Sequence, residues 1–466
     1  MGVKQHSLGK EAKMLGSFRA AVFAARRHEG LYFAALLSEE RILEAFGEAR
    51  ALWQGWLYTP AVTVWVFLSQ CLSMDHSCRE SVARMIAWRV SCGRGTCSPE
   101  TGGYCAARDA LRESICRRLV RETGADLERE APSEWLWHNR RVRVVDGSTI
   151  TMPDTPANQA AYPQLAAQKP GCGFPIARIV VVFSLAVGTV LDAAIGRYEG
   201  KQTGENSMFR TLDDCLADGD VVLADRCFSG WFDIALLLSR GVDVVVRKHQ
   251  LRATDFRKGP RLGNEDHLVR WSKPQRPKWM SPTVYASLPR ELVLREVRVH
   301  VSQKGFRTKQ LDVVTTLVDA ENYSSQDIAD LYRLRWQAEL HLRSLKTVLQ
   351  MNHLRCKKPY RVRNEFWMHL LGYNLLRRVM SLAALKSNAC PWQISFKGTL
   401  QTLNAFLLTL SSGAELDVWC DSLLTAIAGH IVDDRPDRYE PRRIKKRPKS
   451  YTYLMQPRAN YKKRAA

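Results

Sequence analysis

Apolar side chains recur at helical spacing through the first 135 residues. They return every three or four positions, which is the period of an amphipathic α-helix. The segments are Glu39–Leu57, Val62–Leu72, Glu80–Val90 and Ala106–Thr123. A cluster of glycines between residues 93 and 103 interrupts the pattern and predicts a loop. We therefore expect residues 1–135 to form a helical domain.

From Arg140 onward the pattern becomes that of short, apolar strands separated by helices. The predicted strands are Arg141–Val145, Arg178–Ala186, Thr189–Tyr198, Val221–Ala224 and Val242–Val246, and the predicted helices are Glu205–Leu216 and Trp231–Arg240. Gly188 lies between the second and third strands and predicts a hairpin. The order β-β-β-α-β-α-β predicts an α/β domain, a mixed sheet with helices on its faces, over residues 136–360.

Two segments depart from this alternation. Residues 247–278 contain ten Lys or Arg against three acids, and strand-like stretches follow at 292–301 and 311–317, so we interpret residues 247–307 as a basic, β-rich insertion. Residues 361–435 are predicted to be helical. Residues 436–466 form a basic tail, because ten Lys or Arg and no acid lie beyond Pro441.

One predicted helix, between Ser324 and Leu354, carries an unusual polar face. Tyr332, Arg335, Glu339 and Lys346 fall within about 60° of one another at about 100° per residue, and Arg343 falls on the same face. The apolar residues Leu331, Leu334, Ala338, Leu342, Leu345 and Leu349 form a separate stripe. A carboxylate ringed by cations and a phenol is not needed for helix stability. It suits a site where the acid holds a divalent metal ion and the cations hold phosphates.

The overall charge indicates the class of partner. A formal net charge of +22 favours a polyanion, nucleic acid before membrane. The helical first domain, with Arg79, Arg84 and Arg89, would then bind duplex DNA or simply cap the next domain. The polar amino end resembles no secretory signal, and we expect a cytoplasmic, nucleoid-associated protein. Twelve cysteines fit that location as reduced thiols, and the spacing of Cys92, Cys97 and Cys105 does not favour zinc.

Three acids stand out by their context. Asp146 follows the first predicted strand and precedes Gly147, so we expect it where the strand ends in a turn, while Asp225 ends the fourth strand. In a ribonuclease H-like topology these strands are neighbours, and Glu339 arrives on the helix that packs against them. Three carboxylates suit two Mg²⁺ or Mn²⁺ ions. Taken singly, each acid is more typical of a turn or a solvated ion pair.

The spacing Tyr332-x2-Arg335-x3-Glu339-x6-Lys346 resembles the YREK signature of the bacterial insertion-sequence-four family of transposases, to which the transposon-five transposase belongs. Asp146-Gly147-Ser148-Thr149 through Tyr162-Pro163 resembles the first acidic block of that family, and Ala224-Asp225-Arg226-Cys227-Phe228 the second. The resemblance runs from about residue 60 to residue 380.

This resemblance implies a DDE transposase with a ribonuclease H-like fold and a β-rich insertion. It implies cut-and-paste transposition, with cleavage and strand transfer at terminal inverted repeats by a homodimer on double-stranded DNA. It implies that neither a nucleotide cofactor nor a membrane takes part. Asp146, Asp225 and Glu339 would be catalytic metal ligands, and Tyr332, Arg335 and Lys346 would contact DNA. Arg343 is added to this DNA-binding set from helix geometry.

The resemblance leaves the role of two tryptophans open. Some relatives cleave through a DNA hairpin and stack a Trp of the insertion on a flipped base, for which Trp271 and Trp279 are the candidates. Taken alone, each is more typical of a packing aromatic. Two other functions also stay open. One is a structure-specific DNA nuclease, and the other is a non-catalytic DNA-binding regulator derived from a transposase.

Overall fold

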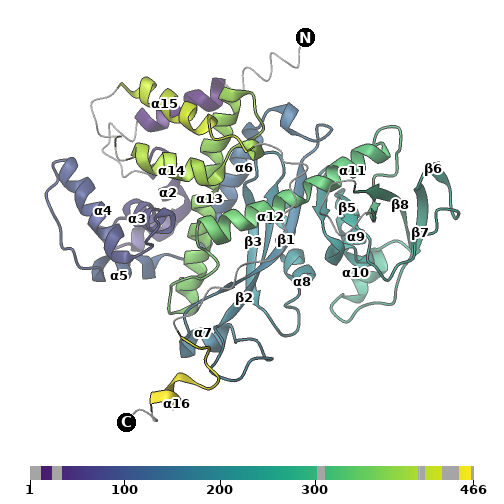
Figure 1. Cartoon of the computed structure of the whole chain (residues 1–466), viewed down its shortest axis with the longest axis horizontal. Coiled ribbons are helices and arrows are strands. Elements are labelled where there is room, and N and C mark those ends of the chain that lie inside the picture. Colours follow the sequence, from purple (N-terminus) through teal and green to yellow (C-terminus); the bar gives the residue numbers. More distant parts are fainter. Residues whose placement is uncertain are drawn as a thin grey trace.

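The computed structural model describes residues 12–23, 34–301, 310–407, 409, 415–432 and 451–462. Its centre is one sheet of nine strands in the order β3-β2-β1-β4-β5-β9-β8-β7-β6 (Figure 1). The strands are β1 Val142–Thr151, β2 Ile176–Ser184, β3 Val190–Arg197, β4 Val221–Ala224, β5 Asp243–Arg247, β6 Arg261–Gly263, β7 Asp266–Ser272, β8 Glu291–His300 and β9 Gln310–Thr315. The first five have the ribonuclease H-like arrangement, with β1, β4 and β5 parallel and β2 antiparallel to β1. The predicted α/β fold is confirmed.

The basic insertion extends this sheet instead of forming a separate unit. Strand β9 pairs antiparallel with β5, and β8, β7 and β6 follow it in turn. The last strand before the signature helix is therefore β9. The short helix α10, Pro282–Ser287, joins β7 to β8. Residues 302–307, the end of the expected insertion, lie outside the described residues.

The first strand corrects one expectation. Asp146 was expected at the end of a strand, in a turn, but β1 continues through it to Thr151. The cause is the neighbouring strand: β2 pairs with β1 along its whole length, from Arg143↔Ser184 to Thr151↔Ile176. A local Asp-Gly pair predicts a turn only where no long-range partner holds the backbone extended.

Helices cover both faces of the sheet. Before the sheet in sequence come a helix at residues 12–23 and the helices α2 Glu39–Phe46, α3 Pro60–Leu72, α4 Cys78–Ser91, α5 Gly102–Ala110 and α6 Glu113–Glu130, of which α6 packs on β3. Those within and after it are α7 Pro156–Ala161, α8 Glu205–Phe209, α9 Trp231–Leu238, α11 Ser325–Leu334, α12 Trp336–Arg343, α13 Pro359–Ser387, α14 Phe396–Leu407, α15 Leu416–Ala428 and α16 Arg458–Lys462. Within the described ranges, none of them combines the length and apolar character needed to cross a bilayer.

Helix α13 connects the helical region to the sheet. It is 29 residues long and buried along most of its length, between α6, α3 and α15. The Asn374 side chain accepts a hydrogen bond from the Val190 N–H at 2.7 Å and donates to the carbonyls of Val190 and Val120. One amide therefore ties together β3, α6 and α13.

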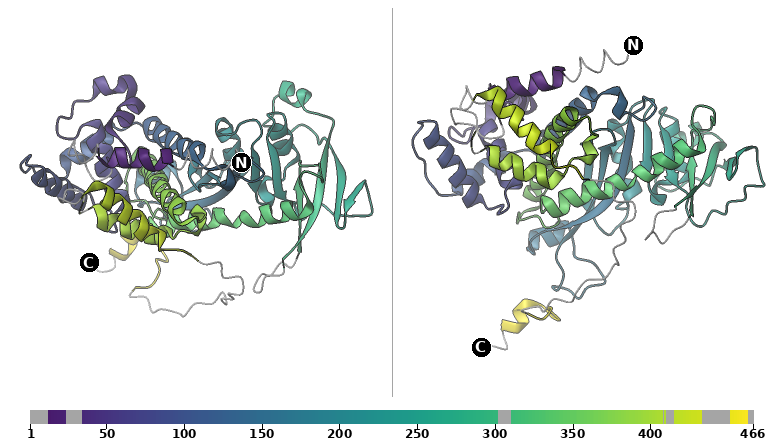
Figure 2. Two further views of the ribbon diagram at one scale, coloured as in Figure 1. Left: turned by 90° about the horizontal axis from the view of Figure 1, so that it is seen from above. Right: turned by 45° about the horizontal axis from the view of Figure 1, so that its top comes forward.

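Two cores lie on opposite faces of the sheet. The larger contains Val144 and Leu223 together with the apolar side of α11, α12 and α13. The smaller contains Val145, Val222 and Ala224 together with α8 and α9. Because side chains alternate between the two faces of a strand, core membership shows which face each strand residue occupies. Figure 2 shows α11 and α12 running along one side of the sheet toward the helical bundle.

Candidate active site at the carboxyl edge of the sheet

Asp146 and Asp225 are neighbours across two parallel strands. The last paired residues of β1 and β4 are Val145 and Ala224, and each aspartate is the next residue along its strand. Both follow a residue of the smaller core, so alternation points both toward the larger core, on the face that carries α12. Asp225 Oδ1 also accepts the Cys227 N–H at 2.7 Å, which fixes the start of the following turn.

Helix α12 packs on β1 and places Glu339 on the same face of the sheet as the two aspartates. The preceding helix α11 starts with a capping box, in which Ser324 and Asp327 satisfy each other's backbone N–H groups. Ala338 and Leu342 are buried in the larger core and orient α12. The three predicted acids therefore converge from β1, β4 and α12.

The signature helix is not one regular α-helix. The Arg335 N–H bonds back only three residues, to Tyr332, and residues Ser344–Val348 form a π-helical turn. A π-turn changes the angle per residue, so the polar face deviates from the predicted one after Arg343. Arg343 is exposed and forms no ion pair among the described residues. Lys346 lies inward and its Nζ donates to Ser148 Oγ at 2.9 Å.

The site is electrostatically crowded. Burial raises the pKa of Asp146 to about 6; the Gly147 N–H and Arg335 lower it, whereas Asp225 and Glu339 raise it. Arg335 Nη2 lies 2.8 Å from Glu339 Oε1. Although burial disfavours its charge, the surrounding phenol and carboxylates hold the pKa of Arg335 above its ordinary value. One guanidinium thus partly compensates the charges of Glu339 and Asp146.

Tyr332 completes the inner wall of the site. Burial raises the pKa of Tyr332 to about 12. Arg335 and Arg247 lower this pKa, and Asp225 raises it. The phenol is therefore protonated at neutral pH and can donate a hydrogen bond. Burial also lowers the pKa of Lys346. Tyr332, Arg335 and Glu339 thus lie near the two aspartates, and Lys346 contacts β1 at Ser148.

The donor set fits a hard divalent cation. All three acids offer only carboxylate oxygens, which Mg²⁺ and Mn²⁺ prefer. Their mutual repulsion contributes to the raised pKa of Asp146, and a bound cation would relieve it. Within the described residues no three acidic, imidazole or thiol groups already meet at one point, and Glu339 pairs with Arg335 instead.

The sequence analysis missed two charged neighbours of the acids. Glu205, at the start of α8, lies against Gly147, so closely that a Cβ there would be 2.4 Å from its Oε1. Burial and Asp225 raise the pKa of Glu205, while Arg178 lowers it. Arg247 ends β5 directly after Val246, the partner of Ala224, and thus lies beside Asp225 in the row of strand ends. The position of Arg247 follows from strand register and that of Glu205 from its contact with Gly147, and local patterns contain neither.

The two tryptophans differ in their exposure. Trp271 is 8% exposed in the smaller core, with the Arg252 guanidinium 3.8 Å from its ring centroid. Trp279 is 40% exposed, and Arg210 lies 3.8 Å from its ring. No hydrogen bond or ring contact in the described part of the chain joins either indole to the YREK residues. Trp271 is thus largely buried, whereas Trp279 keeps an exposed surface.

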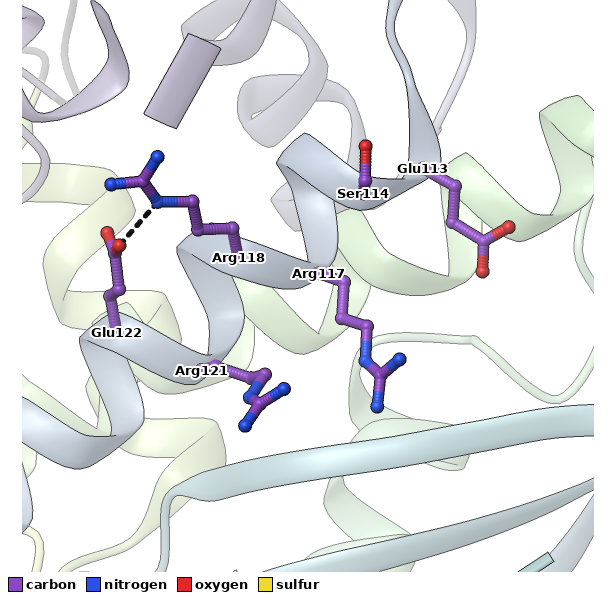
Figure 3. Close-up of a pocket in the computed structure, with 6 residues that line it drawn as sticks. All are labelled: Glu113, Ser114, Arg117, Arg118, Arg121 and Glu122. Carbon is purple, nitrogen blue, oxygen red and sulfur yellow. Dashed lines mark hydrogen bonds and ion pairs between the residues drawn. The ribbon is translucent and has the colours of Figure 1, made fainter. Parts of the chain in front are cut away.

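A further hollow of about 500 Å³ lies on α6 (Figure 3). It is lined by Glu113, Ser114, Arg117, Arg118, Arg121 and Glu122. Arg117 makes two hydrogen bonds to the buried Asp192, which Arg121 also approaches, and Arg118 pairs with Glu122. Its cations already have acidic partners, and none of the three predicted acids lines it.

Comparison with known proteins agrees with this geometry. Residues 137–375, which include all three acids, match the family model described as "Transposase DDE domain". The chain is 30% identical over 361 residues to the Escherichia coli K12 transposase InsG for insertion sequence element IS4, covering 74% of this chain and 76% of the relative. It is 36% identical over 64 residues to the E. coli transposase for insertion sequence element IS421, covering 14% of this chain and 17% of that one.

Among solved structures, the piggyBac transposase in a synaptic complex with hairpin DNA is similar over 85% of this chain and 82% of that one, at 11% identity and a TM-score of 0.40. The family model and the IS4 relative carry the assignment. The chain belongs to the insertion-sequence-four family of DDE transposases, enzymes that cleave DNA.

Proposed function

We propose that this transposase binds the terminal inverted repeats of an insertion sequence and catalyses metal-dependent cleavage and strand transfer, moving the element by cut-and-paste transposition. The observation that supports this best is the proximity of three carboxylates. Asp146 and Asp225 lie on neighbouring strands, and Glu339 lies on the cationic helix that packs on β1. In this proposal the three carboxylates hold two Mg²⁺ or Mn²⁺ ions. When bound, the ions supply activation of a water or a DNA 3′-hydroxyl and stabilisation of the leaving oxygen.

The chain's own side chains position the phosphodiester. Arg335 pairs with Glu339 before DNA binds, and a phosphate, which accepts two hydrogen bonds from a guanidinium, competes for it. Lys346 donates to Ser148, a neutral partner that a phosphate oxygen can replace. The protonated Tyr332 phenol adds a donor within the same wall. Arg343, exposed at the end of α12, is proposed to contact the backbone farther along the duplex.

The remaining regions are proposed to organise the DNA. Residues 1–135 would bind the element ends, and the basic residues 436–466 would add sequence-independent phosphate contacts. The helices within 361–435 would contribute to a homodimer on two DNA ends. Of the two tryptophans, Trp279 is the one we propose for base stacking, because its ring is partly exposed. The protein would act in the bacterial cytoplasm, at the nucleoid.

The test is cleavage of supercoiled plasmid carrying the DNA that flanks the coding sequence, in Mg²⁺ or Mn²⁺. Glu339→Gln removes one charge from the acid set with little change in shape. Asp330→Asn, on the neighbouring helix and paired with Arg333, is the matched control. We expect end-specific excision by wild type and by Asp330→Asn, and its loss in Glu339→Gln.

Three other outcomes would contradict the proposal. Equal cleavage by wild type and Glu339→Gln would refute the role of Glu339. Cleavage without end specificity would favour a structure-specific nuclease. End-specific binding without cleavage by the wild type would favour a regulator derived from a transposase.

A further inference from the structure

A second hollow adjoins the acids on the insertion side. It has a volume of about 210 Å³ and lies where β4 and β5 end, facing β8 and β9. Its lining includes six basic residues, Arg226, Arg247, Lys248, His249, Arg252 and Arg298, and one acid, Asp312. Arg226 is the residue after Asp225. The hollow and the acid set therefore share one edge of the sheet.

Part of this charge is already neutralised inside the insertion. Lys248 Nζ lies 2.8 Å from Glu296 Oε2, and both side chains are buried. Arg298 pairs with Asp312 at 2.8 Å and with Glu265 at 3.2 Å. These two cations hold β5, β8 and β9 together and are not available to an incoming anion.

The other three guanidinium groups have no acidic partner among the described residues. Arg226 donates to the amide oxygen of Gln250 at 2.6 Å. Arg247 lines the hollow and ends β5 beside the strand end that carries Asp225. Arg252 lies over Trp271, and its pKa is lowered by burial, although Glu296 raises it. Three guanidinium groups without an ion-pair partner among the described residues, gathered in one concavity, form a site for an anion with several oxygens.

Trp271 fixes the position of Arg252. The indole is embedded in the smaller core, and its backbone carbonyl accepts a hydrogen bond from Trp231 Nε1 at 2.9 Å. An arginine held against a rigid aromatic face loses less conformational freedom on binding than a free one. The indole face that could have stacked on a base instead carries a guanidinium.

We propose that this hollow binds the DNA backbone beside the cleavage point, with Arg226 and Arg252 each contacting a phosphate and Trp271 serving as the platform for Arg252. The proposal rests on the proposed function, since it extends the DNA path from the acids toward the insertion. Duplex DNA places consecutive phosphates along a continuous line, so a cationic pocket adjoining the acid set lies on a direct continuation of that path.

The test measures how the affinity of the full-length protein for DNA depends on salt. Each phosphate contact on a duplex contributes about 0.9 to the slope of log K against log salt concentration. We would titrate a labelled duplex from the DNA flanking the coding sequence, without divalent ions, into wild type, Arg226→Ala, Arg252→Ala and Arg257→Ala. Arg257 is the matched control, because it lies in the same segment, is exposed and pairs with Asp255.

Arg226→Ala and Arg252→Ala are each expected to reduce the slope by about one unit and to weaken binding about 5- to 10-fold at moderate salt. Arg257→Ala should match the wild type. If wild type binds and cleaves but both hollow variants keep its slope, this inference is overturned and the proposed function stands. An equal loss in Arg257→Ala would also overturn it, by showing a general charge effect. A wild type with no salt-dependent binding would overturn both.

Discussion

Replacing Arg335 by Gln separates its two expected roles, which are pairing with Glu339 in the absence of DNA and donating to the phosphate during cleavage. Arg335 pairs with Glu339 at 2.8 Å and contributes a positive charge beside Asp146. Removing it frees Glu339 and removes a charge that repels a cation. An ion pair with one partner 39% exposed is screened by water, so its coupling is about 1 kcal/mol rather than the several expected in a dry interior. That free energy corresponds to about a fivefold change in affinity.

We therefore expect Arg335→Gln to bind Mn²⁺ about fivefold more tightly than wild type in the absence of DNA. DNA cleavage should change in the opposite direction. Loss of a charged donor to a developing phosphate charge costs about 3 kcal/mol, which corresponds to a rate reduction of about 100-fold or more. A gain in metal affinity combined with a loss in rate is not expected from misfolding, which would lower both.

The assay is a Mn²⁺ titration followed by electron paramagnetic resonance, with single-turnover cleavage measured on the same preparations. Arg333→Gln is the matched control: it lies on the same helix, is exposed and pairs with Asp330. Its metal affinity and rate should equal those of the wild type. Unchanged or weaker Mn²⁺ binding by Arg335→Gln would refute the reasoning that Arg335 and a metal ion compete for Glu339.

Three more predictions follow from single contacts. Gly124→Ala should lower the free energy of unfolding, measured in urea, by about 2 kcal/mol or more, because the new Cβ would lie 2.2 Å from the Val190 carbonyl oxygen. This clash outweighs the gain of about 1 kcal/mol in helix propensity. Lys346→Met should slow single-turnover cleavage about 100-fold, whereas Ser148→Ala, which removes only its neutral partner, should change the rate less than 10-fold. Burial lowers the pKa of His76 to about 4, so the unfolded chain takes up this proton before the folded chain does as pH falls. The free energy of unfolding should therefore decline between about pH 6.5 and pH 4. Over that interval the thermal midpoint of His76→Gln should depend less on pH than that of the wild type.

The parts of the site that could be predicted are those set by local pattern. The strand Val221–Ala224 and the following Asp225 were identified because four consecutive apolar residues end at an acid. Glu339 was identified because helical spacing groups it with Tyr332 and Arg335. Sequence periodicity is sufficient where one element alone determines which residues share a face.

The errors and omissions concern contacts between distant segments. The strand through Asp146 was predicted too short, because its extension depends on pairing with β2. Arg247 and Glu205 were not assigned to the site, because only strand register and the missing side chain of Gly147 bring them there. The π-helical turn after Arg343 also changed the predicted helix face. None of these features leaves a periodic signal in the sequence.

The central claim is that Asp146, Asp225 and Glu339 form one divalent-metal site. The most direct test is Mn²⁺ affinity at pH 7.5 for wild type, Asp146→Asn, Asp225→Asn and Glu339→Gln, with Asp330→Asn as the control. The account predicts that each of the three variants binds Mn²⁺ at least about 10-fold more weakly, since each loses an anionic ligand, while the control is unchanged. Wild-type affinity in any one of the three would contradict it.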